Sequence, residues 1–180
     1  EGRYVGYDYV FEELLKKVDI QPSELDAIAV ANGPGSYTGV RIGVTIAKTL
    51  AWTLNIPIFS VSSLQLLAAN APYFPGVVCT IMDARRGNVF AGIYVDGETV
   101  QEAHMSLPEL LETVGEMGQP VLFVGMDVAI HWEQIKEVLG DKVQRANAAF
   151  SLPSAAVLIE LAKGQEATEV HSVVPEYLRI

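Results

Sequence analysis

The chain has 180 residues, half of them apolar, with a mean hydropathy of +0.27 and a formal net charge of −10. This length can form one domain or two small ones with a sizeable core. The acidic balance argues against a protein that wraps nucleic acid by itself, because affinity for phosphate backbones comes mostly from clustered Lys and Arg.

The positions of the charged residues and of the cysteine further limit the class of protein to which the chain can belong. No Asp or Glu occurs from Ala27 to Met82, so we expect this third of the chain to be core or interface, without a carboxylate for acid–base or metal chemistry. No stretch of about 20 residues is expected to span a bilayer, which makes a partner protein the simplest destination for the apolar excess. Cys79 is the single cysteine and no signal-peptide pattern is found, so we expect a reducing cytoplasm.

The first half of the chain predicts two helices on either side of a strand. Apolar residues at helical spacing predict an amphipathic helix from Tyr7 to Val18, and the apolar run from Ala27 to Ala31 predicts a buried strand. The Asn-Gly-Pro-Gly turn at residues 32–35 ends that strand and opens a long helix that ends near Asn55. This strand–turn–helix unit organises the rest of the chain.

Small residues recur at every fourth position of the long helix, at Gly35, Gly39, Gly43, Ala47 and Ala51. Such a stripe leaves a shallow groove for a second helix, and the helix at 7–18 is the expected neighbour. The alternative is a phosphate cradle in the glycine-rich turn, but its spacing fits neither a P-loop nor a dinucleotide fingerprint. We therefore favour helix packing, and we interpret Ser36 as a cap or turn hydroxyl.

The next elements divide the chain into two predicted lobes. A strand is expected at residues 57–61, and Ser62-Ser63-Leu64-Gln65 is a capping box that opens a helix to about Asn70. Prolines at positions 72 and 75 then break the chain. We place the boundary between lobes here, with residues 1–75 in the first lobe and 76–180 in the second.

The second lobe begins with a predicted hairpin, whose strands are residues 77–82 and 89–95. Further expected elements are a helix through Val114 opened by Ser106, a strand ending at Val124, helices at 127–139 and 154–163, and an extended tail at 173–179. Because strands alternate with helices throughout, the pattern predicts an α/β fold with a sheet at its centre.

No local catalytic or metal-binding pattern is found. His104, His131 and His171 stand far apart, and none lies three to five residues from another His or Cys. We interpret His131 as a surface or packing residue. The densest polar cluster is Asp83-Ala84-Arg85-Arg86-Gly87, whose charges are either solvated at the hairpin tip or contact a phosphate or a partner's carboxylate.

Five strings closely resemble the bacterial TsaB (YeaZ) family. They are Asn32-Gly33-Pro34-Gly35-Ser36-Tyr37-Thr38-Gly39-Val40-Arg41-Ile42-Gly43, Ala47-Lys48, residues 57–62, Asp83-Ala84-Arg85-Arg86-Gly87 and Pro175-Glu176-Tyr177-Leu178-Arg179. The resemblance implies a two-lobed actin/Hsp70-like (RNase H-like) fold. It also implies a non-catalytic scaffold that helps to make threonylcarbamoyladenosine beside the anticodon of tRNAs that read codons beginning with A.

The resemblance further implies which molecules this scaffold meets. The expected partners are the catalytic paralogue TsaD, the ATPase TsaE and, for the isolated chain, a second copy of itself, with tRNA bound only through the complex and no membrane contact. We expect no catalytic residue, no metal site and no cofactor bound by the chain alone, with ATP or ADP at an interface of the complex.

A four-helix interface with the paralogue or a second copy is the predicted binding mode. Its expected residues are Val10, Leu14, Gly35, Gly39, Val40, Gly43, Val44, Ala47 and Leu50. The candidates for contact with a phosphate or a partner are Arg41, Asp83, Arg85 and Arg86.

One departure from the family pattern concerns the first lobe. The family begins with a strand bearing Ile-Asp-Thr-Ser and a hairpin, whereas this chain enters its first helix almost at once, so we expect the N-terminal strands to be missing. The alternative function is a nucleotide-dependent kinase or hydrolase, or a peptidase-like member, of the actin-like superfamily, with Asp83 or an unseen N-terminal Asp holding magnesium. The His-x-x-x-His pair of the peptidase-like members is absent.

Overall fold

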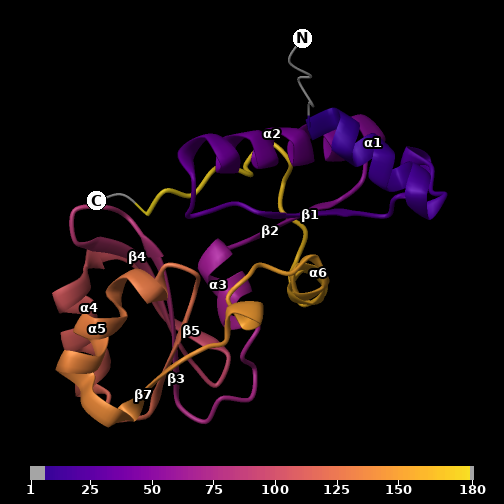
Figure 1. Ribbon diagram of the computed structural model, residues 1–180. Helices are drawn as coiled ribbons and strands as arrows, with labels where there is room; N and C mark the ends of the chain where they lie inside the picture. Colours follow the sequence, from indigo (N-terminus) through magenta and orange to yellow (C-terminus); the bar gives the residue numbers. More distant parts are fainter. Residues whose placement is uncertain (1–6, 179–180) are drawn as a thin grey trace.

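The computed structural model describes residues 7–178, with side chains from residue 11 onward. Two β-sheets form the centres of two lobes (Figure 1). No helix among the described residues is both long and apolar enough to cross a membrane. The chain therefore has the α/β architecture that the alternating pattern predicted.

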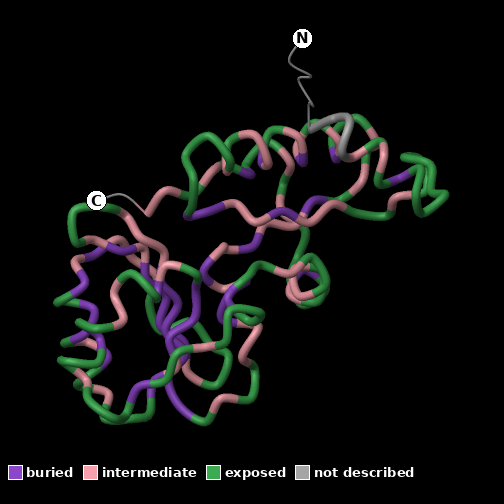
Figure 2. Tube along the Cα trace, in the orientation of Figure 1, coloured by how far each residue is buried: buried purple, intermediate pink, exposed green. Residues whose placement is uncertain are grey.

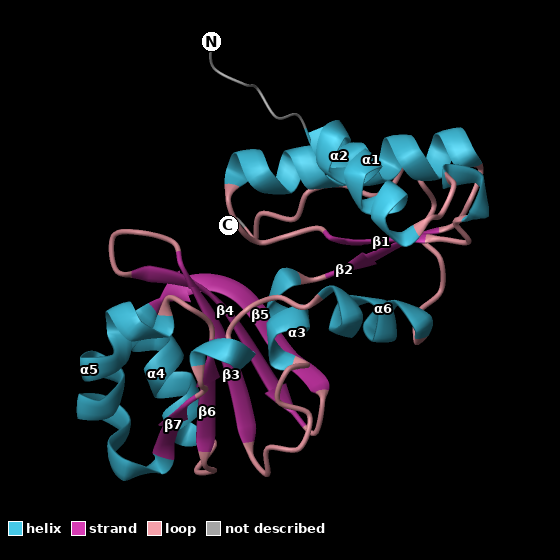
Figure 3. Cartoon of the chain, turned by 45° about the vertical axis from the view of Figure 1, so that its right-hand side comes forward, coloured by secondary structure: helices cyan, strands magenta, loops and turns pink. Residues whose placement is uncertain are grey.

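The first sheet is small and parallel. Its strands are β1 (Ile28–Ala31) and β2 (Ile58–Val61), joined through α2 (Tyr37–Leu54) as a β-α-β crossover. Helix α2 and helix α1 (Tyr7–Val18) lie on one side of this sheet, and α6 (Ala155–Lys163) lies on the other (Figures 1 and 3). A short 3-10 helix, η1 (Pro22–Glu24), connects α1 to β1.

The second sheet has five strands in the order β5-β4-β3-β6-β7. Their bounds are β3 (Val77–Asp83), β4 (Asn88–Val95), β5 (Glu98–Ser106), β6 (Val121–Val124) and β7 (Val143–Arg145). The pairs β3–β4 and β4–β5 are antiparallel, whereas β3–β6 and β6–β7 are parallel. Helices α4 (Leu107–Glu116) and α5 (Val128–Leu139) cover one face, and α3 (Ser63–Ala68) packs on the other.

The sequence of strand β3 is nearly continuously apolar because both faces of the strand are covered. Val77, Cys79 and Ile81 belong to the cluster under α4 and α5, whereas Val78 packs with the cluster under α3. This alternation follows from the two-residue period of a strand. Buried residues accordingly concentrate along the second sheet (Figure 2).

Each lobe is completed by elements from both sides of residue 75. Helix α3 follows β2 directly but packs against β3 and β4, while α6 comes after the second sheet and contacts β1 and β2. The tail at 173–178 also returns to the first lobe, where Val173 joins the cluster of β1, α2 and β2. The backbone N–H of Glu176 donates to the carbonyl of Asn32 at 2.7 Å. The two lobes are thus connected by several crossings of the chain.

Most of the predicted elements are confirmed within one or two residues. Ser62, Ser106 and Ser154 each cap the helix that follows, and Gly164 ends α6. Two strands, β5 and β7, were not predicted. Both lie at edges of the second sheet, where exposed polar positions interrupt the alternation that marks a half-buried strand. Two further 3-10 helices, η2 (Gly140–Lys142) and η3 (Ala148–Phe150), flank β7.

Candidate functional site

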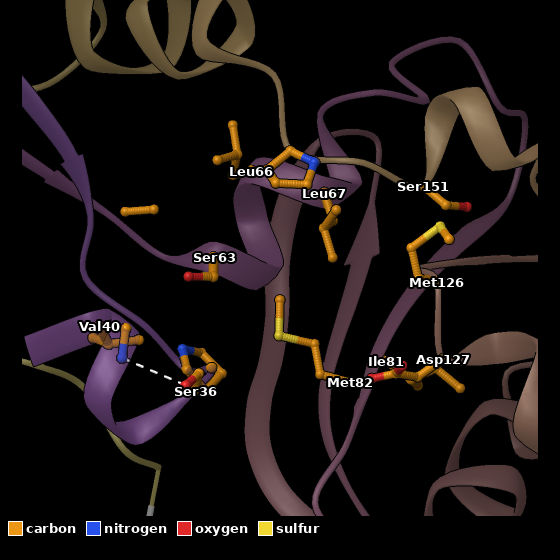
Figure 4. A pocket seen from close by; sticks show the side chains of 15 residues that line it. Ser36, Val40, Ser63, Leu66, Leu67, Ile81, Met82, Met126, Asp127 and Ser151 are labelled. Carbon is orange, nitrogen blue, oxygen red and sulfur yellow. Dashed lines mark hydrogen bonds between the residues drawn. The ribbon is translucent and has the colours of Figure 1, made fainter. Parts of the chain in front are cut away.

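A cavity of about 400 Å³ lies between the two lobes (Figure 4). One wall is the glycine-rich turn and the first turn of α2, and the other is the end of β3 with the loop before α5. Its lining comprises Ala31, Pro34, Gly35, Ser36, Gly39, Val40, Ser63, Leu66, Leu67, Ile81, Met82, Met126, Asp127, Ser151 and Pro153. Asp127 is the one charged residue among these, so the cavity is mainly apolar and offers no side-chain cation.

The glycine-rich turn is held from two directions. The carbonyl of Gly33 accepts a hydrogen bond from the N–H of Ser63 at 2.7 Å, and a Cβ at Gly33 would overlap the carbonyl oxygen of Glu176. Gly33 also has φ +120°, which disfavours any residue with a side chain. Ser36 accepts from the N–H of Gly39 at 3.4 Å, which confirms its predicted role as a helix cap.

Asp83 is the centre of a polar cluster behind the second wall. Its backbone N–H donates to Oδ2 of Asp127 at 2.8 Å, and its carboxylate lies 3.3 Å from Nε2 of His131 and 3.4 Å from the guanidinium of Arg85. The side chains of Asp83 and His131 are only 13% and 12% exposed. Among the described residues no group of three or more His, Cys, Asp or Glu is placed to hold a metal ion.

The sequence missed a second polar cluster, which joins the lobes at Glu102. Its carboxylate accepts from the hydroxyl of Tyr94 at 2.5 Å and from the hydroxyl of Ser62 at 2.7 Å. Burial, followed by the hydrogen bond to Glu102, raises the pKa of Tyr94 well above its usual range. Ser62 also caps α3, so Glu102 ties the edge strand β5 to the crossing between lobes. No sequence signal marked Glu102, because β5 itself was not predicted.

The small-residue stripe does not act as one groove, which corrects the prediction for it. Gly35 precedes α2 and lies outside the helix. Steps of four residues drift about 40° around a helix, so Ala47 and Ala51 turn toward the first sheet and are buried there. A Cβ at Gly43 would meet no atom of the described residues within 4 Å. The described side chains of α1, from residue 11 onward, therefore do not fill the stripe at this point.

The predicted interface residues divide into buried and accessible ones. Val44 is 2% exposed and Ala47 is 6% exposed, because both pack in the chain's own core. The side chain of Val10 lies outside the described residues. Leu14, Gly35 and Gly39 are exposed. Val40, Gly43 and Leu50 are half-buried, and Val40 packs against the core of the first lobe.

Helices α1 and α2 also expose large apolar side chains that the prediction did not name. Val18 lies one turn after Leu14 on α1, and the two are 52% and 55% exposed. Trp52 on α2 is 67% exposed. We call Leu14, Val18, Gly43 and Trp52 the helix surface; it extends over both flanks of α2, because Gly43 and Trp52 are nine residues and therefore about 180° apart on that helix. An exposed apolar surface of this kind is typical of a protein–protein contact.

The four predicted contact residues lie on different lobes. Arg41 lies on α2, where its guanidinium donates to the hydroxyl of Tyr37 at 2.6 Å and lies 5.2 Å from the centre of that ring. Tyr37 in turn stacks on Tyr177. Asp83 and Arg85 are neighbours on the second lobe, and Arg86 lies beside them in the β3–β4 turn.

Residues 8–179 match the family model described as TsaD, tRNA N6-adenosine threonylcarbamoyltransferase. The tRNA threonylcarbamoyladenosine biosynthesis protein TsaB of Bacillus subtilis is 48% identical over 172 residues, which cover 93% of this chain and 75% of that protein. TsaB of Escherichia coli is 36% identical over 85 residues, 46% of this chain and 37% of that protein.

Solved structures give the same assignment. YeaZ from Pseudomonas aeruginosa superposes with a TM-score of 0.72 at 29% identity, covering 93% of this chain and 80% of that one. A second Pseudomonas aeruginosa structure, described as similar to the peptidase YeaZ, gives 0.78 at 28% identity, covering 98% and 85%. The class is thus a TsaD-like protein with the two-lobed fold of the actin-like superfamily. Within that class, the chain belongs to the TsaB (YeaZ) family.

Proposed function

We propose that this chain is a non-catalytic scaffold subunit in tRNA threonylcarbamoyladenosine biosynthesis and that it binds a TsaD-like catalytic paralogue through the helix surface. The observation that carries the proposal is the pair of helices α1 and α2, which lie on one side of the first sheet and expose Leu14, Val18 and Trp52. Fully burying one aliphatic side chain stabilises a complex by about 1.5–3 kcal/mol. Burial of these side chains therefore contributes to the stability of the complex, against the cost of the freedom that the two partners lose on binding.

The cavity between the lobes supports the non-catalytic part of the proposal. A nucleotide triphosphate needs cations or many N–H donors, yet the lining holds no Lys or Arg and its charged residue is Asp127. We therefore propose that the chain alone binds no nucleotide, and that ATP or ADP binds at an interface of the complex. An ATPase assay of the purified chain tests this, because turnover without a partner would favour the enzyme alternative.

The remaining partners follow from the same proposal. We propose that the helix surface pairs two copies of the isolated chain and that a TsaE-like ATPase joins the complex. The net charge of −10 supports weak or no binding of tRNA by the isolated chain. A gel-shift experiment near 0.15 M salt measures this binding, and submicromolar affinity would contradict the proposal.

Gly43→Leu is the sharpest test of the helix surface. Because a Cβ there meets open space among the described residues, the variant is expected to fold and to place a bulky side chain where a partner helix approaches. Calorimetry with the purified TsaD-like paralogue should show at least tenfold weaker binding, with circular dichroism to confirm folding. The control Lys136→Ala, on α5 of the other lobe, should bind like the wild type. A folded Gly43→Leu protein with wild-type affinity would remove α2 from the interface.

A further inference from the structure

The turn between β3 and β4 has an unusual backbone. Arg85, Arg86 and Gly87 are three consecutive residues in the left-handed region, with φ of +69°, +56° and +77°. Glycine adopts this conformation freely, and Asn is the side chain that tolerates it best, whereas Arg is disfavoured. Two arginines therefore occupy positions for which the backbone favours Asn or Gly.

The surrounding structure forces this conformation on the two arginines. Across the turn, the N–H of Ala84 donates to the carbonyl of Asn88 at 2.9 Å, and the N–H of Asn88 donates to the carbonyl of Arg85 at 3.0 Å. The carbonyl of Gly87 accepts from the N–H of Leu107 at the start of α4, also at 3.0 Å. A strained conformation persists only when its neighbours over-determine it. The turn is thus a fixed platform for its side chains.

Folding does not explain why these side chains are arginines. Arg85 is 87% exposed and has one ion pair, with Asp83 at 3.4 Å. The guanidinium of this pair is solvated although the Asp83 side chain is only 13% exposed, and His131 also lies 3.3 Å from that carboxylate, so the pair contributes little to stability. Arg86 is exposed and has no ion pair or hydrogen bond with the described residues. A strained, exposed pair of cations in a chain of net charge −10 points to an intermolecular role.

We propose that Arg85 and Arg86 form a docking knob that enters a carboxylate-lined recess of a partner protein. This inference rests on the proposed function, because the partner is the TsaD-like paralogue. The turn projects from the second sheet, on the same side of the molecule as the start of α2 and the end of the tail (Figures 1 and 3). A partner that covers α2 can therefore reach it.

Three physical arguments favour a protein as the occupant. Small molecules bind in concave sites, whereas this turn projects outward. A chain of net charge −10 repels nucleic acid beyond the immediate contact. A rigid turn suits a preformed recess of a folded protein because it loses little conformational freedom when it binds, and guanidinium groups bind carboxylates, as they do phosphates, in a bidentate geometry.

The test compares two double variants that remove the same charge. In Arg85→Asn/Arg86→Asn the backbone strain is relieved, so the unfolding temperature should rise. Its affinity for the purified paralogue should fall about tenfold at about 0.05 M salt, and by less at about 0.3 M, because salt screens the lost contacts. The control Lys136→Asn/Lys142→Asn, on exposed positions of the same lobe, should bind within about twofold of the wild type.

Each outcome of this comparison either supports or contradicts the proposed docking role of Arg85 and Arg86. Wild-type affinity of the Asn pair for the paralogue would overturn the knob while leaving the proposed function in place, and a lower unfolding temperature would overturn the argument from strain. Loss of tRNA binding to the assembled complex with unchanged paralogue affinity would assign the knob to RNA instead. If the wild-type chain does not bind the paralogue, the proposed function is wrong and the knob is wrong with it.

Discussion

The two lobes differ in the size of their sheets, whereas both expose large apolar side chains: Ile130 and Val138 on α5 of the second lobe are 65% and 57% exposed. The second lobe has five strands, with α4 and α5 on one face of the sheet and α3 on the other, and Phe123, Leu110 and Ile135 are completely buried in its core. The first lobe has two four-residue strands, takes Val173 from the tail into its core, and still leaves Leu14 and Trp52 largely exposed. A small sheet buries too little apolar area to be stable alone.

This difference suggests a division of roles between the two lobes. We propose that the second lobe provides most of the stability of the chain and that the first lobe provides the surface for a partner. The carbonyl of Gly33 accepts from the N–H of Ser63 at the start of α3, and Glu102 accepts from the hydroxyl of Ser62, the cap of the same helix, so both contacts lie where the chain passes from β2 to the second lobe. The four experiments below test the division, beginning with the largest expected effect.

Opening a cavity in the second lobe should have the largest effect. Phe123 is 0% exposed, so Phe123→Ala should lower the free energy of unfolding by about 3–5 kcal/mol. Urea denaturation measures the change. The matched pair that compares the lobes is Ile58→Ala in the first and Ile81→Ala in the second, because both side chains are fully buried; Ile58→Ala should cost less because the first lobe can relax around the cavity. An Ile58→Ala cost equal to that of Ile81→Ala would contradict the division.

Detaching the tail from the first lobe should have the next largest effect. Gly33→Ala adds a Cβ that overlaps the carbonyl of Glu176 at a positive φ, so we expect a loss of roughly 2–3 kcal/mol. Limited proteolysis should then cut the tail at 173–178 faster than in the wild type. The control Gly43→Ala has open space and should stabilise α2 by roughly 0.5–1 kcal/mol. Equal proteolysis of both variants would show that the tail does not depend on Gly33.

Removing the carboxylate that joins the lobes comes third. Glu102→Ala leaves the hydroxyls of Ser62 and Tyr94 without their acceptor, which should cost roughly 1–3 kcal/mol. Hydrogen exchange should increase at α3, whose cap is Ser62. Glu98 lies on the same strand but is exposed, so Glu98→Ala should change stability by less than about 0.5 kcal/mol. Indistinguishable effects of the two variants would exclude Glu102 as a tie.

The smallest expected effect is a pH dependence from Tyr94. Its folded-state pKa is raised, mainly by burial, so above about pH 10 the unfolded chain loses this proton while the folded chain keeps it. The free energy of unfolding should therefore fall as the pH rises above 10. Tyr94→Phe should show a shallower fall in urea titrations between pH 9 and about 11. Parallel curves for the two proteins would mean that Tyr94 is not protected by the fold.

Local signals were sufficient for most of the fold. Helix caps such as Ser106 and Ser154, and the apolar runs of β1, β2 and β3, act over a few residues, so they could be recognised without tertiary information. The edge strand β5 could not, because its pairing with β4 compensates for a sequence with little strand pattern. The hydrogen bonds of Glu102 were not predicted either, because Glu102 lies on that strand.

The candidate site was predicted less completely for the same reason. The turn at 32–35 and the cluster at 83–87 each consist of consecutive residues, so both could be identified from the sequence. The sequence did not show that Asp127 and His131 lie against Asp83, since these contacts span more than 40 residues. The prediction of one groove along the small-residue stripe was wrong because Ala47 and Ala51 turn toward the first sheet. The position of that sheet is known only from the tertiary structure.

The sequence by itself determined the family, the α/β alternation and the positions of most helix caps, because each depends on residues that are close in the chain. Tertiary structure decided which lobe each element joins, which interface candidates stay accessible, and that two arginines sit in a left-handed turn. These properties depend on packing between distant segments. A side chain becomes buried, and a strained backbone is held in place, only when segments that are distant in the sequence pack against each other.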